Sequence, residues 1–251
     1  MTENPADFGI PSGANDGWGP NAMLTVGYAI QPERRRMAIG LDLGTLQDST
    51  VMVCMESVES PEVDCDGKPV VGPDLVQKLS RPIYQIRLIK RLPLGLSYPM
   101  IAAQVALVMS NPECRNAQLV LDRTCVGVPT QDIFESAGLS PIGITSTGST
   151  QEGKLDHGGV NYSVGKLALV SRLQAELQCG RLKFPPVSEL PEIKIFRDEL
   201  RNFSVRVSDT GHASFGAAGS GHDDSVSAAC LALWWLAPRT GNDWQAETID
   251  F

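Results

Sequence analysis

The chain has 251 residues, of which 42% are hydrophobic and 20% are charged, so it is long enough for one large domain with a sizeable core or for two small ones. The formal net charge is −8 at pH 7, which argues against a general nucleic-acid-binding surface. No apolar run is long enough to cross a membrane, and the first residues lack the pattern of a secretion signal. The six cysteines are scattered without a CxxC pair, which indicates reduced thiols in a cytoplasmic protein.

The first half of the chain predicts a three-stranded antiparallel meander. Residues 1–36 are rich in Gly, Pro, Asn and Asp, and we expect them to form a flexible arm. Three runs that are apolar or alternate with a period of two then predict strands, at residues 37–43, 49–56 and 83–91. Residues 58–82 contain Pro, Gly and acidic side chains and predict a long excursion with a hairpin turn around residues 66–67.

After the third strand the pattern changes to strands that alternate with helices. Helices are predicted at residues 99–109 and 128–137, and short apolar strands at residues 117–122 and 141–145. This alternation indicates parallel strand pairing. The fold class is therefore α/β, with a mixed sheet of three antiparallel strands followed by parallel strands, flanked by helices.

The last hundred residues predict a loop, three helices and a hairpin. Residues 145–159 are rich in Ser, Thr and Gly and predict a loop. The remaining predicted elements are an amphipathic helix at 164–179, a linker at 185–191, a short helix at 192–200, hairpin strands at 203–207 and 212–215, and a final helix at 222–236. We expect one domain over residues 37–238, preceded by the arm and followed by a polar tail at 239–251.

Aspartates stand at three places where chemistry would need them. Asp42 lies inside an apolar strand, and burying an unpaired charge there costs several kcal/mol. Asp122 ends a second strand, and Asp223 and Asp224 open the last helix. Helix capping and turn formation are the ordinary alternatives for the last three. Together these side chains fit a site for hard cations, since Mg²⁺ and Mn²⁺ prefer carboxylate oxygen and water.

Three segments carry a resemblance to a known family. GLDLGTLQDSTVMVCME, LVLDRTCVGVPTQDIF and GHDDSVSAACLALWW, in this order and spacing, resemble the nuclease domain of phage terminase large subunits. The linking segments VGKLALVSRLQAELQCGRLKF and FSVRVSDTGHASF resemble it too, so the similarity extends over about residues 37–236. The resemblance implies a ribonuclease H-like endonuclease that cuts concatemeric viral DNA during genome packaging.

The resemblance also implies a metal site and its ligands. Asp42, Asp122 and Asp223 match the triad that binds two Mg²⁺ or Mn²⁺ ions, which would activate a water and stabilise the 3′-oxygen leaving group. Asp224 is an additional or alternative ligand, because the sequence does not separate it from Asp223. Asp48 matches a further acidic position, or is an ordinary turn residue.

Basic side chains offer contacts to DNA phosphates on an otherwise acidic chain. No acidic residue lies between Asp74 and Glu113, so this stretch predicts either a phosphate-facing surface or a solvated strand face. Lys166 matches a lysine of the family that faces phosphate, or is a solvated residue at a helix start. His222 is expected to contact a phosphate, a metal-bound water or only the backbone. The side chains expected to bind DNA are Arg87, Lys90, Arg91, Lys166 and Arg172.

Two departures from the family bear on function. The chain has no G-x-x-x-x-G-K-[ST] phosphate loop, so we expect either that the packaging ATPase is a separate polypeptide, or that this is a stand-alone nuclease-like protein or a remnant. Cys125 stands where the family usually has glycine, and we expect this small side chain to be tolerated. The expected partners are double-stranded DNA, that ATPase, the small terminase and the portal, in the host cytoplasm and without a membrane.

Other functions remain open at this point. A Holliday-junction resolvase uses the same fold and carboxylates and would be a stable dimer. A non-catalytic packaging or assembly module would keep the fold without the nuclease activity. An α/β domain of unrelated function is the remaining alternative.

Overall fold

The computed structural model describes residues 27–44, 48–114, 116–124, 127–148, 154–155, 161–207, 213–217 and 223–238. The predicted arm up to residue 26, most of the Ser- and Gly-rich loop, and the tail at 239–251 lie outside these ranges. No helix in the described ranges has both the length and the apolar character that crossing a bilayer requires.

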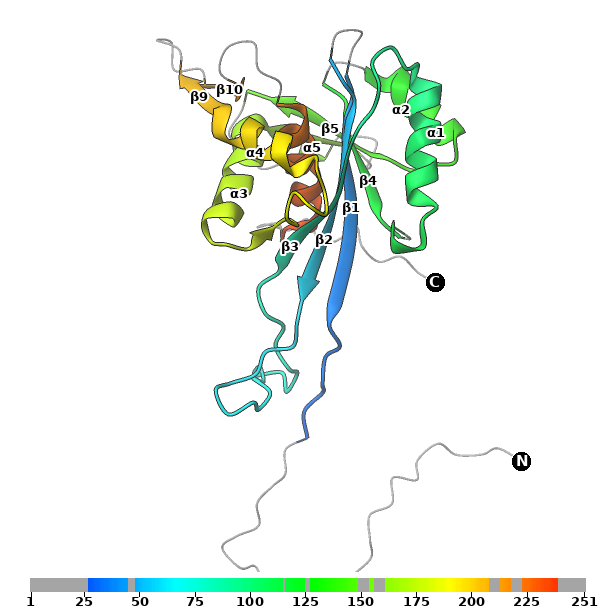
Figure 1. The fold of residues 1–251 in the computed structure, drawn as a ribbon. Coiled ribbons are helices and arrows are strands. Elements are labelled where there is room, and N and C mark those ends of the chain that lie inside the picture. Colours follow the sequence, from blue (N-terminus) through cyan, green and yellow to red (C-terminus); the bar gives the residue numbers. More distant parts are fainter. Residues whose placement is uncertain are drawn as a thin grey trace, which may run out of the picture.

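A mixed sheet forms the centre of the molecule (Figure 1). In the described part of the chain it has eight strands, in the order β6-β7-β5-β4-β1-β2-β3-β8. An antiparallel meander comprises β1 (Arg34–Asp42), β2 (Val51–Glu59) and β3 (Ile83–Arg91). Parallel pairing continues from β1 through β4 (Gln118–Asp122), β5 (Ile142–Thr147) and β7 (Asn161–Gly165). The predicted mixed sheet is therefore confirmed.

Helices cover both faces of this sheet (Figure 1). One face carries α1 (Tyr98–Met109) and α2 (Gly127–Ser136), with the 3₁₀ turn η1 (Pro112–Cys114) after α1. The other face carries α3 (Lys166–Gln178), α4 (Ile193–Asn202) and α5 (Asp224–Leu236). A separate hairpin of β9 (Phe203–Val207) and β10 (Ala213–Ala217) lies between α4 and α5 in the chain, as predicted.

The alternation of side chains along β1 divides the core in two. Ile39 and Leu41 point into the cluster under α1 and α2, whereas Ala38 belongs to the cluster under α3 to α5. Gly40 lies on the α5 face, because a Cβ built there would stand 1.9 Å from the carbonyl oxygen of Ala228. Side chains two residues apart share a face, so Asp42 follows Ala38 and Gly40 onto the face that α5 covers.

Helix α5 is buried on nearly every side. Eleven of its residues are buried, and the helix packs against β1, β2 and β4 at the centre of the sheet. Such an all-round apolar helix is typical of a core element. Its position, close above β1, brings its first residues to the end of the sheet where β1 and β4 end.

The differences from the predicted elements lie mostly at edges. Strand β7 and the two-residue strands β6 (Lys154–Leu155) and β8 (Leu182–Lys183) were not predicted. Strand β1 starts three residues before its predicted start. The hairpin turn in the excursion is confirmed, since the Gly67 N–H donates to the Asp64 carbonyl over 3.0 Å and Gly67 has a φ of +75°. The cysteines among the described residues are not disulfide-bonded.

Candidate active site

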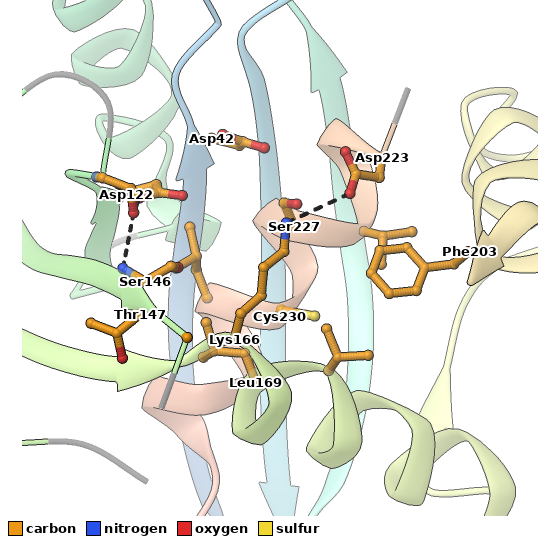
Figure 2. A pocket seen from close by; sticks show the side chains of 15 residues that line it. Asp42, Asp122, Ser146, Thr147, Lys166, Leu169, Phe203, Asp223, Ser227 and Cys230 are labelled. Carbon is orange, nitrogen blue, oxygen red and sulfur yellow. Dashed lines mark hydrogen bonds and ion pairs between the residues drawn. The ribbon is translucent and has the colours of Figure 1, made fainter. Parts of the chain in front are cut away.

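A pocket of about 440 Å³ opens on the α5 face of the sheet, and Asp42, Asp122 and Asp223 all line it (Figure 2). The three side chains come from β1, from β4 and from the residue before α5. Lys166, the first residue of α3, also lines the pocket and reaches toward the carboxylates. The sequence predicted this meeting, and the fold explains it: β1 and β4 are parallel neighbours, and α5 crosses above them.

Asp42 is the most perturbed acid of the site. Its pKa lies well above the ordinary value of 3.8, first because burial disfavours the charged carboxylate. The negative charges of Asp122, Asp224 and Asp223 raise this pKa further, in that order, and the positive charge of Lys166 opposes them. Acidic side chains whose pKa is shifted by burial and by neighbouring charges cluster at functional sites, so Asp42 marks this pocket as a candidate site.

Asp122 is oriented by the turn that follows β4. Its Oδ1 accepts hydrogen bonds from the Thr124 backbone N–H, at 2.8 Å, and from the Thr124 hydroxyl. The Thr124 hydroxyl oxygen in turn accepts the Ser146 N–H at 2.9 Å, which ties the turn to β5. Both bonds to the carboxylate reach the same oxygen, so the side chain has a fixed direction at the pocket wall.

The structure separates Asp223 from Asp224, which the sequence could not do. Asp223 lines the pocket, with its Oδ2 3.9 Å from Lys166 Nζ. Asp224 turns the other way, and its Oδ2 accepts a 2.6 Å hydrogen bond from the Arg91 guanidinium. We therefore assign the pocket-facing position to Asp223.

The donor set fits divalent metal ions. Within the described ranges, no three His, Cys, Asp or Glu side chains lie close enough to enclose an ion as they stand. Three carboxylates nevertheless line one pocket, and the negative charges of its neighbours raise the pKa of the buried Asp42. A hard cation would relieve this repulsion, and carboxylate oxygens are the ligands that Mg²⁺ and Mn²⁺ prefer.

Four of the five basic residues predicted to bind DNA do not line this pocket and have partners elsewhere. Arg91 contacts Asp224 and Glu199, whereas Arg87 pairs with Glu56. The Lys90 ammonium donates to the Gln104 side chain, and the Arg172 guanidinium to the Pro238 carbonyl. Lys166 is the predicted residue that the pocket includes. Of these five residues, Lys166 is therefore the one that the structure brings to the carboxylates.

Three further residues that the sequence singled out are Asp48, His222 and Cys125. Asp48 is described and exposed, and it is not among the residues that line the pocket. His222 and Cys125 lie outside the described residues.

Sequence reasoning missed the hydroxyl residues of the pocket. Thr124, Ser146 and Thr147 all line it. A signal for Thr124 was present, because a Thr two residues after a strand-ending Asp can form a local side-chain turn. Ser146 and Thr147 belong to β5, which extends two residues beyond its predicted end at residue 145.

Comparison with known proteins bears on the fold. No protein-family model matches the chain, and no curated protein matches its sequence. The crystal structure of the large terminase nuclease from thermophilic phage G20c matches with a TM-score of 0.52 and 22% sequence identity, over 82% of this chain and 92% of that one. The chain has the fold of a large terminase nuclease.

Two further structures of the G20c large terminase nuclease match as well. The one with bound magnesium has a TM-score of 0.53 and 21% identity, over 82% of this chain and 84% of that one. The one with bound cobalt has a TM-score of 0.52 and 20% identity, over 82% and 92%. At these identities the likeness establishes the fold, and the chemistry must be argued from the pocket.

Proposed function

We propose that this protein is a divalent-metal-dependent DNA endonuclease of the terminase type. The observation that carries the proposal is the meeting of Asp42, Asp122 and Asp223 at one pocket. Two supports are independent of it. The fold is that of large terminase nucleases, and the G20c nuclease has been crystallised with magnesium and with cobalt.

The three carboxylates would hold two Mg²⁺ or Mn²⁺ ions, whose Lewis acidity supplies water activation and stabilises a 3′-oxygen leaving group. Asp42 would be the ligand that both ions share, because it lies on β1 next to β4 and below the start of α5. Thr124 fixes the direction of Asp122 through the two bonds to Oδ1. Lys166 offsets part of the negative charge, and in this proposal its ammonium would contact a phosphate of the bound DNA.

The acidic character of the protein fits a nuclease that depends on partners. With a net charge of −8, sequence-independent attraction to DNA is weak and falls steeply with salt. A packaging ATPase, a small terminase and a portal would then supply affinity and cleavage position, in the cytoplasm of the host cell.

The proposal is tested by nicking and linearisation of supercoiled plasmid in Mg²⁺, in Mn²⁺ and in chelator. The variant is Asp122→Asn, which keeps an oxygen to accept both Thr124 bonds and removes the charge. Asp132→Asn is the matched control, because Asp132 is exposed on α2 and does not line the pocket. We expect metal-dependent cutting by the parent and the control, and a loss of at least about 100-fold in Asp122→Asn, since a metal ligand's charge is essential to this chemistry.

The outcomes separate the candidate functions. Cutting that survives Asp122→Asn means that the pocket is not the active site. A folded parent that binds Mn²⁺ in calorimetry but does not cut favours a nuclease that needs a packaging ATPase, and cleavage is then assayed with that ATPase added. A folded parent that neither cuts nor binds metal is a non-catalytic module, and the proposal then fails.

A further inference from the structure

Helix α5 begins without the side-chain cap that its sequence offers. An Asp at the N-cap position ordinarily accepts a hydrogen bond from the backbone N–H two or three residues further on. Asp223 occupies the N-cap of α5, yet its side chain makes no capping hydrogen bond. The first turn of α5 is buried, so its N–H groups need another acceptor.

Glu199 of α4 is that acceptor. Its Oε2 accepts hydrogen bonds from the backbone N–H groups of Ser225, at 3.0 Å, and Val226, at 3.3 Å. These are the second and third residues of α5, whose N–H groups an N-cap side chain normally satisfies. Glu199 thus caps α5 from a neighbouring helix.

A second contact holds Glu199 in place. Its Oε1 accepts a 2.7 Å hydrogen bond from the Arg91 guanidinium, which also bonds to Asp224 at 2.6 Å. The Glu199 residue is 6% exposed. Burial raises the pKa of its carboxyl, and the hydrogen bond from Ser225 and the charge of Arg91 counteract that rise. A buried carboxylate is tolerated only when it is paired and hydrogen-bonded in this way.

The position of Glu199 on α4 is otherwise apolar. Ile193 and Phe196, six and three residues earlier, are fully buried on the same helix face. An apolar residue at 199 would extend this face, so a Glu there implies a specific task.

We propose that Glu199, held by Arg91, is a positioning residue that caps α5 in place of Asp223. Because Glu199 caps the helix, the Asp223 carboxylate is left to point into the pocket as a metal ligand. The inference rests on the proposed function, because it concerns how the same metal site is held. Without Glu199, the Asp223 side chain would turn back to cap its own helix.

The test compares Glu199→Gln with the parent and with Asp198→Asn. Glutamine keeps the size of the side chain but cannot serve both α5 and Arg91 as an acceptor. Asp198 is the neighbouring carboxylate on α4, exposed and paired with Arg201, so it is a matched control. The readouts are the Kd for Mn²⁺ by calorimetry, the Mn²⁺ concentration that gives half-maximal plasmid cleavage, and hydrogen exchange at the start of α5.

We expect Glu199→Gln to raise the Kd for Mn²⁺ and the Mn²⁺ concentration for half-maximal cleavage by about tenfold or more. Residues that orient metal ligands typically contribute 10–100-fold to affinity or activity. Saturating Mn²⁺ should restore its cleavage rate, whereas Asp223→Asn should stay inactive at every metal concentration. The Ser225 and Val226 amides should exchange faster in Glu199→Gln, and Asp198→Asn should behave as the parent in all three readouts.

If the Glu199→Gln variant folds and has the same metal dependence and amide exchange as the parent, the inference is overturned. The proposed function still stands in that case, provided that the parent cuts DNA. A parent that neither binds metal nor cuts removes the proposed function, and the positioning role with it. If Glu199→Gln does not fold, Arg91→Lys applies the same readouts, since lysine keeps the charge but loses the two-pronged contact. Unchanged metal affinity in folded Arg91→Lys, with unchanged exchange at Ser225 and Val226, then overturns the inference.

Discussion

Replacing Gly40 with alanine tests whether the close approach of α5 to β1 builds the site. A Cβ at this position would stand 1.9 Å from the Ala228 carbonyl oxygen and 2.9 Å from the Ala232 nitrogen. Carbon–oxygen contacts normally stay at about 3.3 Å or more, so α5 and β1 would have to separate by roughly 1.4 Å (3.3 − 1.9). Both sides of the contact are backbone, so no side-chain rotation can relieve it.

The expected cost lies at the upper end of the overpacking range, about 3 kcal/mol. For a domain of this size, that corresponds to a fall in Tm of roughly 6–12 °C. The displacement also moves the start of α5 relative to β1, so Asp223 and Asp42 would no longer meet at their present spacing. We therefore expect metal-dependent cleavage by Gly40→Ala to fall by about 100-fold, because a shift of about 1 Å in reacting groups costs that much.

Thermal unfolding followed by circular dichroism, with plasmid cleavage on the same samples, measures both effects. Gly27→Ala is the control, since a Cβ at Gly27 meets nothing within 4 Å and should leave Tm unchanged or slightly raised. A Gly40→Ala protein that melts within about 2 °C of the parent, against the range worked out above, would refute the reasoning. It would show that the sheet and helix yield at little cost.

Two further predictions concern the charges of the pocket. Burial and neighbouring negative charges raise the pKa of Asp42 in the folded protein. The free energy of unfolding therefore falls as the pH rises from about 4 through this raised pKa, and it stays at the lower value at higher pH. In chelator, the Tm of Asp42→Asn should therefore be higher than that of the parent at pH 8, and the difference in Tm should be smaller at pH 4. A Tm of the variant equal to or below that of the parent at pH 8 contradicts this. Lys166→Gln should weaken DNA binding and reduce the slope of log K against log salt by about one, as measured by fluorescence anisotropy in Mg²⁺. Arg87→Gln is the comparison, because Glu56 already neutralises Arg87, and an equal loss in the two variants would refute the assignment to Lys166.

The parts of the fold that the sequence predicted are those with strong local patterns. Strand β3 has its predicted bounds, but its predicted alternation holds only in the first half: a register shift against β2 places Leu88 with the cluster under α1 and α2, whereas Tyr84 and Ile86 belong to the cluster under α3 to α5. Gly138 and Gly180 end α2 and α3 with φ values of +78° and +66°, a conformation that glycine adopts without strain. The approach of Asp42 to Asp122 followed from strand order, since parallel neighbours end at the same edge of a sheet.

The parts that it did not predict depend on tertiary contacts. Arg91 looks like one more basic residue in an acid-free stretch, but its partner Asp224 lies 133 residues away along the chain. Strand β7 is five residues long and follows a Ser- and Gly-rich stretch, so its pairing with β5 decides its structure. Asp223 and Asp224 are equivalent by composition and differ only in direction, which Glu199 and Arg91 help to set.

The order in which the elements appear along the chain bears on biosynthesis. Asp42 and Asp122 are made early, whereas Asp223 stands at the start of α5, the last of the described elements. A ribosome that has released residues up to the hairpin has therefore produced a sheet whose centre still lacks its cover of α5, and a pocket that lacks one wall. The three carboxylates come together only when α5 docks, so an unfinished chain lacks the assembled pocket, and completion of the core and completion of the pocket are one event.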